Sequence, residues 1–198
     1  MFNVTDVYNW WLYRLCGKID SRGGNPGDNR CLITVDGTDC KIYEPTPFDP
    51  KWFSHKFLGP GVRYEVGICI VTGKIVWVHG PFPCGDWPDL RIFRNCLMGC
   101  LAPREFVIAD GGYYDGYEYT VTPTGANEWL DSKESEARAR HETVNRRFKQ
   151  FNVIGSRFRH NKHLHGICFR AVANIVELMI ETNSPLFNVE YDESMFYE

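Results

Sequence analysis

The chain contains no apolar run that approaches the length of a membrane-spanning helix. Its first residues, MFNVTDVYNWWLYRLCG, also lack the charged start and uninterrupted apolar core of a signal peptide. Eight cysteines are present, but no two form a CxxC pair, and several lie in apolar, strand-like segments where a thiol behaves as a small buried hydrophobe. These absences argue against secretion and membrane insertion, and we expect a soluble, intracellular protein.

Internal repeats and low-complexity linkers are absent as well. A chain of 198 residues without either suits one domain with a small appendage. We expect a helix and loop extension over residues 1–30, one main domain over 31–185 and an acidic tail over 186–198.

The formal net charge of -3 hides a strong asymmetry. Segment 138–162 has a net charge of +7, because Glu142 is its only acid, and the remainder of the chain is therefore at -10. A concentrated basic block favours a polyanionic partner such as nucleic acid. The alternative is a solvated helix face, since basic helices are common.

Apolar and β-branched residues predict four strands, CLITVD (31–36), RYEVGICIV (63–71), KIVWVHG (74–80) and REFVIAD (104–110). Thr72-Gly73, between the second and third strands, predicts a hairpin. Helical spacing of apolar residues predicts helices over 87–98, 132–150 and 164–182. Because the strands are too apolar to be half solvated, we expect an α/β fold with a mixed sheet covered by helices on both faces.

Two of the predicted strands end in an acid that precedes glycine, at Asp36 and Asp110. Asp before Gly is also ordinary turn chemistry at a strand end. If the two strands are neighbours, however, both carboxylates emerge at one edge of the sheet, where ligands of open α/β sheets bind. A third acid on a helix across that edge, Glu142, would complete a site for a hard divalent cation, which prefers oxygen ligands.

The helix around Glu142 has two distinct faces. An apolar stripe that should face the core consists of Ala137, His141, Val144, Phe148 and Phe151. Arg138, Glu142 and Lys149 lie within about 40° of one another on a polar face. The alternative interpretation is a ladder of ion pairs between Glu142 and Arg138 or Arg146, each worth about 0.2–0.5 kcal/mol.

These residues together resemble a known family. DGT at 36–38, GPFPCGDWPDLRIF after the hairpin, ADGGY at 109–113 and the R-x3-E-x6-K spacing at 138, 142 and 149 are similar to the catalytic domain of DDE transposases, in particular the PIF/Harbinger group and related insertion-sequence transposases. The resemblance covers residues from about 31 to 182, and its specificity comes from the order and spacing of the motifs together.

The resemblance implies a ribonuclease-H-like fold for the main domain and a metal-dependent DNA endonuclease or transposase activity. Asp36, Asp110 and Glu142 would be the catalytic acids and would hold two Mg²⁺ or Mn²⁺ ions. DNA phosphates would be bound by a basic track made of Arg138, Lys149, Arg146, Arg147, Arg157 and Arg159. A DNA substrate places the protein in the nucleus of a eukaryote, or otherwise in the cytoplasm.

The chain also departs from the family pattern. Ser135 stands where insertion-sequence transposases have a Tyr that the family pattern associates with the leaving strand. Few residues precede Asp36, so we expect target-sequence recognition to be missing, truncated or supplied by a separate DNA-binding protein. Asp89 matches a family aspartate, although we expect it to serve as a first-turn helix acid. The family also implies a homo-oligomer.

Two further hypotheses remain open at the sequence level. A non-catalytic DNA-binding protein derived from a transposase could retain the fold and the basic track. A zinc site could form at His160, His163 and His165, although such a cluster is more often a polar loop.

Overall fold

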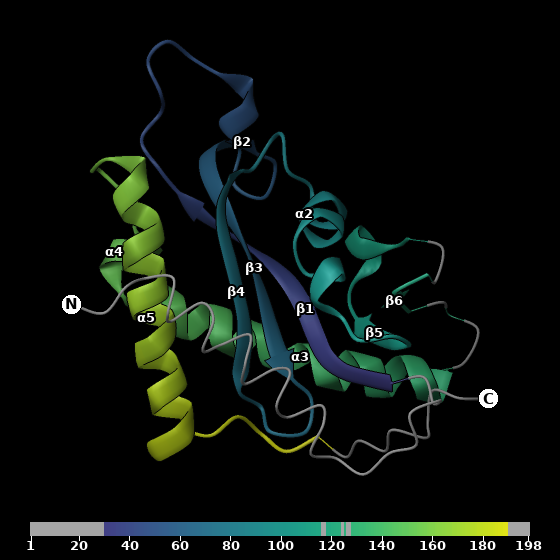
Figure 1. Cartoon of the computed structure of the whole chain (residues 1–198). Coiled ribbons are helices and arrows are strands. Elements are labelled where there is room, and N and C mark those ends of the chain that lie inside the picture. Colours follow the sequence, from purple (N-terminus) through teal and green to yellow (C-terminus); the bar gives the residue numbers. More distant parts are fainter. Residues whose placement is uncertain (1–29, 116–117, 124, 126–127, 190–198) are drawn as a thin grey trace.

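The computed structural model describes residues 30–115, 118–123, 125 and 128–189. A mixed six-stranded sheet forms its centre, with the order β2-β3-β1-β5-β6 and β4 paired to β3 (Figure 1). The strands are β1 (Arg30–Lys41), β2 (Phe53–Ser54), β3 (Gly59–Cys69), β4 (Ile75–Pro83), β5 (Glu105–Ile108) and β6 (Thr120–Val121). The pairs β1–β3 and β3–β4 are antiparallel, whereas β1–β5 and β5–β6 are parallel.

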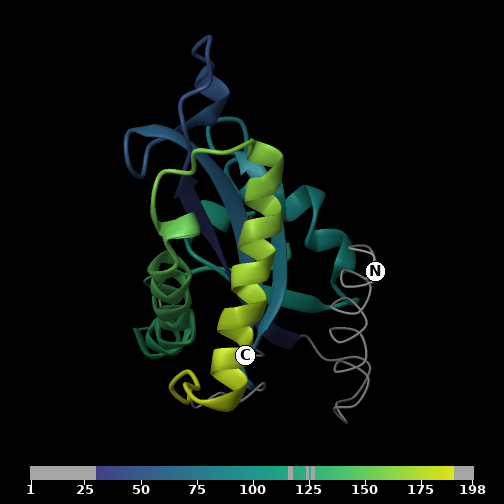
Figure 2. The ribbon, with the colours of Figure 1, turned by 90° about the vertical axis from the view of Figure 1, so that its left-hand side faces the viewer.

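Helices cover both faces of this sheet (Figures 1 and 2). One face carries α3 (Glu128–Gln150), α4 (Asn152–Gly155) and α5 (Lys162–Thr182), and the other carries α2 (Asp89–Asn95). Short 3-10 turns complete the chain path: η1 (Pro50–Trp52), η2 (Met98–Cys100) and η3 (Gly111–Tyr113). The α/β fold with a mixed sheet flanked by helices is therefore confirmed, and it is compatible with a ribonuclease-H-like fold.

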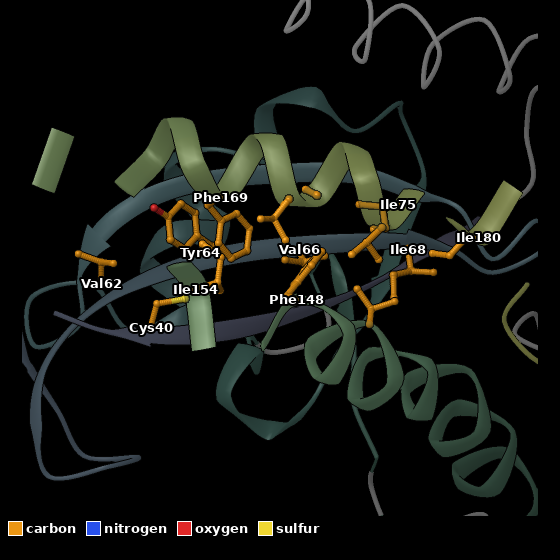
Figure 3. Packing of buried hydrophobic residues seen from close by; sticks show 14 of the residues in the cluster. Cys40, Val62, Tyr64, Val66, Ile68, Ile75, Phe148, Ile154, Phe169 and Ile180 are labelled. Atoms are coloured by element: carbon orange, nitrogen blue, oxygen red, sulfur yellow. The ribbon is translucent and has the colours of Figure 1, made fainter. Parts of the chain in front are cut away.

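A separate hydrophobic cluster lies on each face. On the face of α3 and α5, the Tyr64 ring stacks on Phe169 with centroids 3.7 Å apart, and Phe148 meets Phe169 edge-on (Figure 3). On the face of α2, the cluster includes Val35, Phe93 and Val107. Each fully buried side chain of this size contributes about 1.5–3 kcal/mol, so both layers hold the sheet in place.

The helical stripe predicted from the sequence is confirmed. Ala137, His141, Val144 and Phe148 on α3 are buried against the sheet, and Phe151 packs against the same cluster. The predicted hairpin also forms, with Gly73 in the left-handed region at φ 68° between β3 and β4.

Several predicted boundaries differ from the structure, and three of these differences bear on the site or on the extent of the domain. β1 does not end at Asp36 but continues to Lys41, because β3 pairs with it along its whole second half. The helix predicted over 87–98 is limited to α2, which begins after Pro88 and breaks at Cys96. Residues assigned to the acidic tail are partly held in the fold, since Leu186 joins the core and the Phe187 carbonyl accepts hydrogen bonds from Arg140.

Two other expectations concern the ends of the chain and the membrane. The extension over residues 1–30 lies outside the described residues, apart from Arg30. α5 is long and apolar enough to cross a membrane on length and composition alone, a test that the core helix of a soluble protein also passes.

Candidate functional site

The register of β1 and β5 places Asp36 beside Asp110. Thr34 pairs with Ile108 in this parallel pair, and each acid lies two residues further along its own strand direction. Asp110 lies just past the end of β5, where its carboxylate caps η3 by accepting a hydrogen bond of 2.9 Å from the Gly112 amide. β1 and β5 are therefore neighbours, as the predicted convergence of the two acids requires, although Asp36 lies within its strand and not at its end.

β1 is paired on only one side beyond this point. Thr34 is its last residue paired with β5, and pairing on that side resumes at Ile42, which bridges to Phe158. Between them, no strand in the described part of the chain pairs with this side of Val35–Cys40, which we call the open edge. A sheet edge that is open beside two acids leaves room for a ligand to approach both.

α3 crosses the sheet next to these acids. The His141 Nε2 atom lies 2.9 Å from the Thr34 hydroxyl oxygen, and one turn later the Asn145 amide nitrogen donates to Asp36 Oδ2 at 3.2 Å. Burial lowers the pKa of His141 to about 4, so this histidine is neutral at physiological pH and serves as part of the core. These two contacts fix which flank of α3 faces Asp36.

Glu142 is about 60° further round α3 than Asn145 at 100° per residue, on the side away from the buried His141. Among the described residues, its carboxylate does not form one cluster with those of Asp36 and Asp110. The Glu142 side chain is exposed and lines a surface hollow together with Asn145 and Lys149, which also line the cavity that contains Asp36. Within the described residues Glu142 forms no ion pair, so the ladder with Arg138 or Arg146, the alternative interpretation of this helix, is not formed.

The carboxyl group of Asp36 is in an environment that disfavours its charge. Burial raises its pKa above the ordinary value, and the negative charge of Asp110 raises it further. Lys56, the Gly37 amide and the Asn145 amide act in the opposite direction but do not cancel the effect. A partly buried acid with a second negative charge beside it is suited to a cation.

Asp89 approaches the same site from the α2 face. It is the first residue of α2, as expected, but it is also mostly buried, and its Oδ1 atom lies 3.3 Å from Nη1 of Arg63. A Cβ atom added to Gly37 would lie 2.0 Å from Asp89 Oδ1, which shows how closely Asp89 contacts β1. Burial is the main cause that raises the pKa of Asp89, and the charge of Asp36 adds to it.

A buried ion pair supports this arrangement. Arg63 donates from Nε and Nη2 to the two carboxylate oxygens of Asp39, at 2.7 and 3.1 Å, and Ser54 donates to the same carboxylate at 2.5 Å. Lys56 donates from Nζ to the Gly37 carbonyl at 2.8 Å. Arg63 therefore neutralises Asp39 and stabilises Asp89, so that the acids beside the open edge keep fixed positions.

Asp36 and Asp110 supply some, but not all, of the ligands of a divalent-cation site. Both offer oxygen ligands, and the Asn145 Oδ1 atom near them is buried without a hydrogen-bond partner. Across the described residues, no three His, Cys, Asp or Glu side chains lie close enough to share one ion. Mg²⁺ usually takes one or two protein carboxylates and completes its octahedron with water and substrate phosphate, which matches this donor set.

The six cations predicted to bind DNA do not all share one surface. Arg138, Arg146 and Lys149 lie on the flank of α3 that bears Glu142. Arg157 and Arg159 lie over the Tyr43 ring, at 5.8 and 5.9 Å from its centroid. Arg147 lies on the opposite flank, where it donates to the Ser184 carbonyl at 2.6 Å, and this contact removes it from the predicted track.

The histidine cluster is dispersed. His165 is fully buried, and its Nδ1 atom lies 2.7 Å from the Tyr64 hydroxyl oxygen. His160 and His163 are both exposed. Burial lowers the pKa of His165 to about 4. The structure does not bring these three residues together, because the first turns of α5 direct His165 into the core.

Sequence reasoning missed the role of Asn145. A signal for Asn145 was available in the sequence, since Asn145 follows Glu142 by three residues and therefore lies near it on the helix surface.

Comparisons with protein-family models, with curated proteins and with solved structures found no match.

Proposed function

We propose that the protein is a metal-dependent DNA endonuclease of the DDE transposase type, which cuts phosphodiester bonds and joins DNA strands. The observation that carries this proposal is the β1–β5 register, which sets Asp36 beside Asp110 next to the flank of α3 that bears Glu142. The neighbouring cations favour a polyanionic substrate, and the raised pKa of Asp36 favours a bound cation.

The residues of the site have distinct roles in this proposal. Asp36 and Asp110 would hold one Mg²⁺ or Mn²⁺ ion, and Glu142 would contribute to a second; when bound, such ions would activate water or a DNA 3′-hydroxyl and stabilise the leaving oxygen. Asn145 and the Gly37 amide hold the Asp36 carboxylate in one orientation. Phosphoryl transfer depends on positioning and charge neutralisation, so the site needs no Cys or Ser nucleophile.

Binding of the DNA backbone falls to the cations on the same flank. Arg138 lies on the flank of α3 that bears Glu142, where its guanidinium group would bind a phosphate oxygen. Lys149 lines both the hollow at Glu142 and the cavity at Asp36, and it would hold the phosphate between them. Such contacts bind strongly at low salt and carry little sequence information.

The test is nicking of supercoiled plasmid DNA with MnCl₂. We expect the wild-type protein to nick, and Asp36→Asn, Asp110→Asn and Glu142→Gln each to lower the rate by about 100-fold or more, because each removes stabilisation worth several kcal/mol. Asp86→Asn, at an exposed acid near α2, serves as the matched control and should nick at the wild-type rate.

Undiminished nicking by Asp36→Asn or Asp110→Asn would contradict the proposed site. DNA binding without nicking by the wild-type protein would favour the non-catalytic alternative. A separate DNA-binding partner, a homo-oligomer and a nuclear or cytoplasmic location remain predictions that follow from the same proposal.

A further inference from the structure

A cavity of about 430 Å³ opens along the open edge of β1, directly beside Asp36. One wall is β1 itself, from Asp36 to Lys41. α3 and α4 form the second wall through Asn145, Lys149, Ile154 and Gly155, and the third wall consists of Lys56 and Phe57. Segments from four separate parts of the chain therefore enclose it, and we call it the edge cavity.

The edge cavity is positively charged. Lys41, Lys56 and Lys149 line it, against the acids Asp36 and Asp39. The charge of Asp39 is already matched by Arg63, with which it forms two hydrogen bonds. Three ammonium groups against one remaining carboxylate attract an anionic ligand, and the Lys56 contact with the Gly37 carbonyl disfavours addition of a peptide strand at this edge.

The size of the edge cavity and the Phe57 ring narrow the choice of ligand. About 430 Å³ is at the small end of the range for ligand sites, which is roughly 300–1,000 Å³, so one nucleotide unit fits and a duplex does not. Phe57 is half-buried, and its ring is held against β3, since a Cβ atom on Gly61 would lie 2.5 Å from Phe57 Cζ. A fixed aromatic ring is a surface on which an unpaired base stacks.

The edge cavity also lies between two other features of the proposed DNA track. Asp36 is at one end, and the other end of β1 leads to Tyr43 with Arg157 and Arg159 beside it. From Asp36 to Tyr43 the chain extends about 23 Å at roughly 3.3 Å per residue. This length exceeds one nucleotide, so a strand that continues past the edge cavity along β1 would reach Arg157 and Arg159.

We propose that the edge cavity binds one nucleotide of an unpaired DNA strand next to Asp36, with its phosphate held by Lys41, Lys56 and Lys149 and its base against Phe57. This inference rests on the proposed endonuclease function and adds the form of the substrate: DNA that is single-stranded on one side of the bond that is cut. Lys41, Lys56 and Phe57 become strand-binding residues.

The experiment is a fluorescence anisotropy titration in EDTA, with a 12-nucleotide oligothymidylate and a 12-base-pair duplex as probes. We expect Phe57→Leu, which keeps the packing on Gly61 but removes the ring, to weaken single-strand binding about 5- to 100-fold and leave duplex binding unchanged. Lys41→Ala should lower the single-strand salt slope by about 0.7. Arg94→Ala, an exposed cation on α2, is the matched control and should change neither probe.

Equal weakening of both probes by Phe57→Leu, or no change in either, would overturn the proposal. A folded state of each variant, checked by its thermal unfolding, excludes loss of structure as the cause. Because the titration contains no divalent metal, its outcome is independent of nicking: a protein that binds the single strand through Phe57 but does not nick would refute the proposed activity alone.

Discussion

Asp36 and Asp39 lie three residues apart on β1, yet their surroundings act on their charges in opposite directions. Burial and Asp110 raise the pKa of Asp36. Burial also acts against the charge of Asp39, but hydrogen bonds from Arg63 and Ser54 outweigh it and lower the pKa of that carboxyl group. The two residues therefore offer a matched pair, in which one substitution should have opposite effects on stability.

We predict that Asp36→Asn stabilises the fold at pH 7 while it abolishes activity. The pKa of Asp36 is higher in the folded chain than in the unfolded chain, where it is about 3.9. The free energy of unfolding therefore falls as the pH rises from about 3.9 through the pKa of the folded state, because the folded state disfavours the charged carboxylate. Removing the charge should raise the free energy of unfolding by about 0.5–2 kcal/mol. Each kcal/mol should raise the Tm by about 2–4 °C. Thermal unfolding measured against pH should show the gain vanish below about pH 3.9.

Asp39→Asn should instead destabilise the protein, by about 3–5 kcal/mol, because it leaves the buried Arg63 guanidinium without its charged partner. Above the ordinary Asp pKa this loss is complete, and it should shrink as the wild-type Asp39 itself becomes protonated in acid. A loss of stability with Asp36→Asn, or none with Asp39→Asn, would refute this assignment of the two environments.

At the scale of elements, the structure shows which boundaries local sequence can predict. The stripe of α3 was predictable, because Ala137, Val144 and Phe148 recur at the period of one helix. The length of β1 was not, since DGTDC contains polar residues and glycine that read as a turn. Thr38 and Asp39 pair with β3, and the distant Arg63 and Ser54 hydrogen-bond to Asp39. Such distant partners are invisible in the local sequence pattern.

The contact between β1 and α2 gives the prediction at this scale. Ala at position 37 would place a Cβ atom 2.0 Å from Asp89 Oδ1, so Gly37→Ala should displace Asp89 and cost about 1–3 kcal/mol of stability. Gly111→Ala is the matched control, because nothing lies within 4 Å of an added Cβ there, and its effect should stay within about 0.5 kcal/mol. Urea unfolding would measure both, and equal effects would contradict the close β1–α2 contact.

At the scale of the whole molecule, the sequence was sufficient for the layers but not for the site. Apolar strands and helices specified a mixed sheet with two covered faces, because burial depends on patterns that are repeated along the chain. Asn145, Lys56 and Phe57 could not be placed at Asp36 from sequence, since their position depends on how α3 and the β2–β3 turn pack across the open edge. Only part of the basic segment forms a cationic surface, because Arg140 and Arg147 donate hydrogen bonds to the carbonyl groups of Phe187 and Ser184.

The central claim is that Asp36 and Asp110 repel each other and that a divalent cation relieves this repulsion. Thermal unfolding with increasing MnCl₂ tests it most directly. At 100 times the dissociation constant, Mn²⁺ should stabilise the wild-type protein by about 2.7 kcal/mol, and the Asp86→Asn control equally, whereas Asp36→Asn and Asp110→Asn should show little or no rise in Tm. An equal rise in all four proteins, or none in the wild type, would contradict the claim.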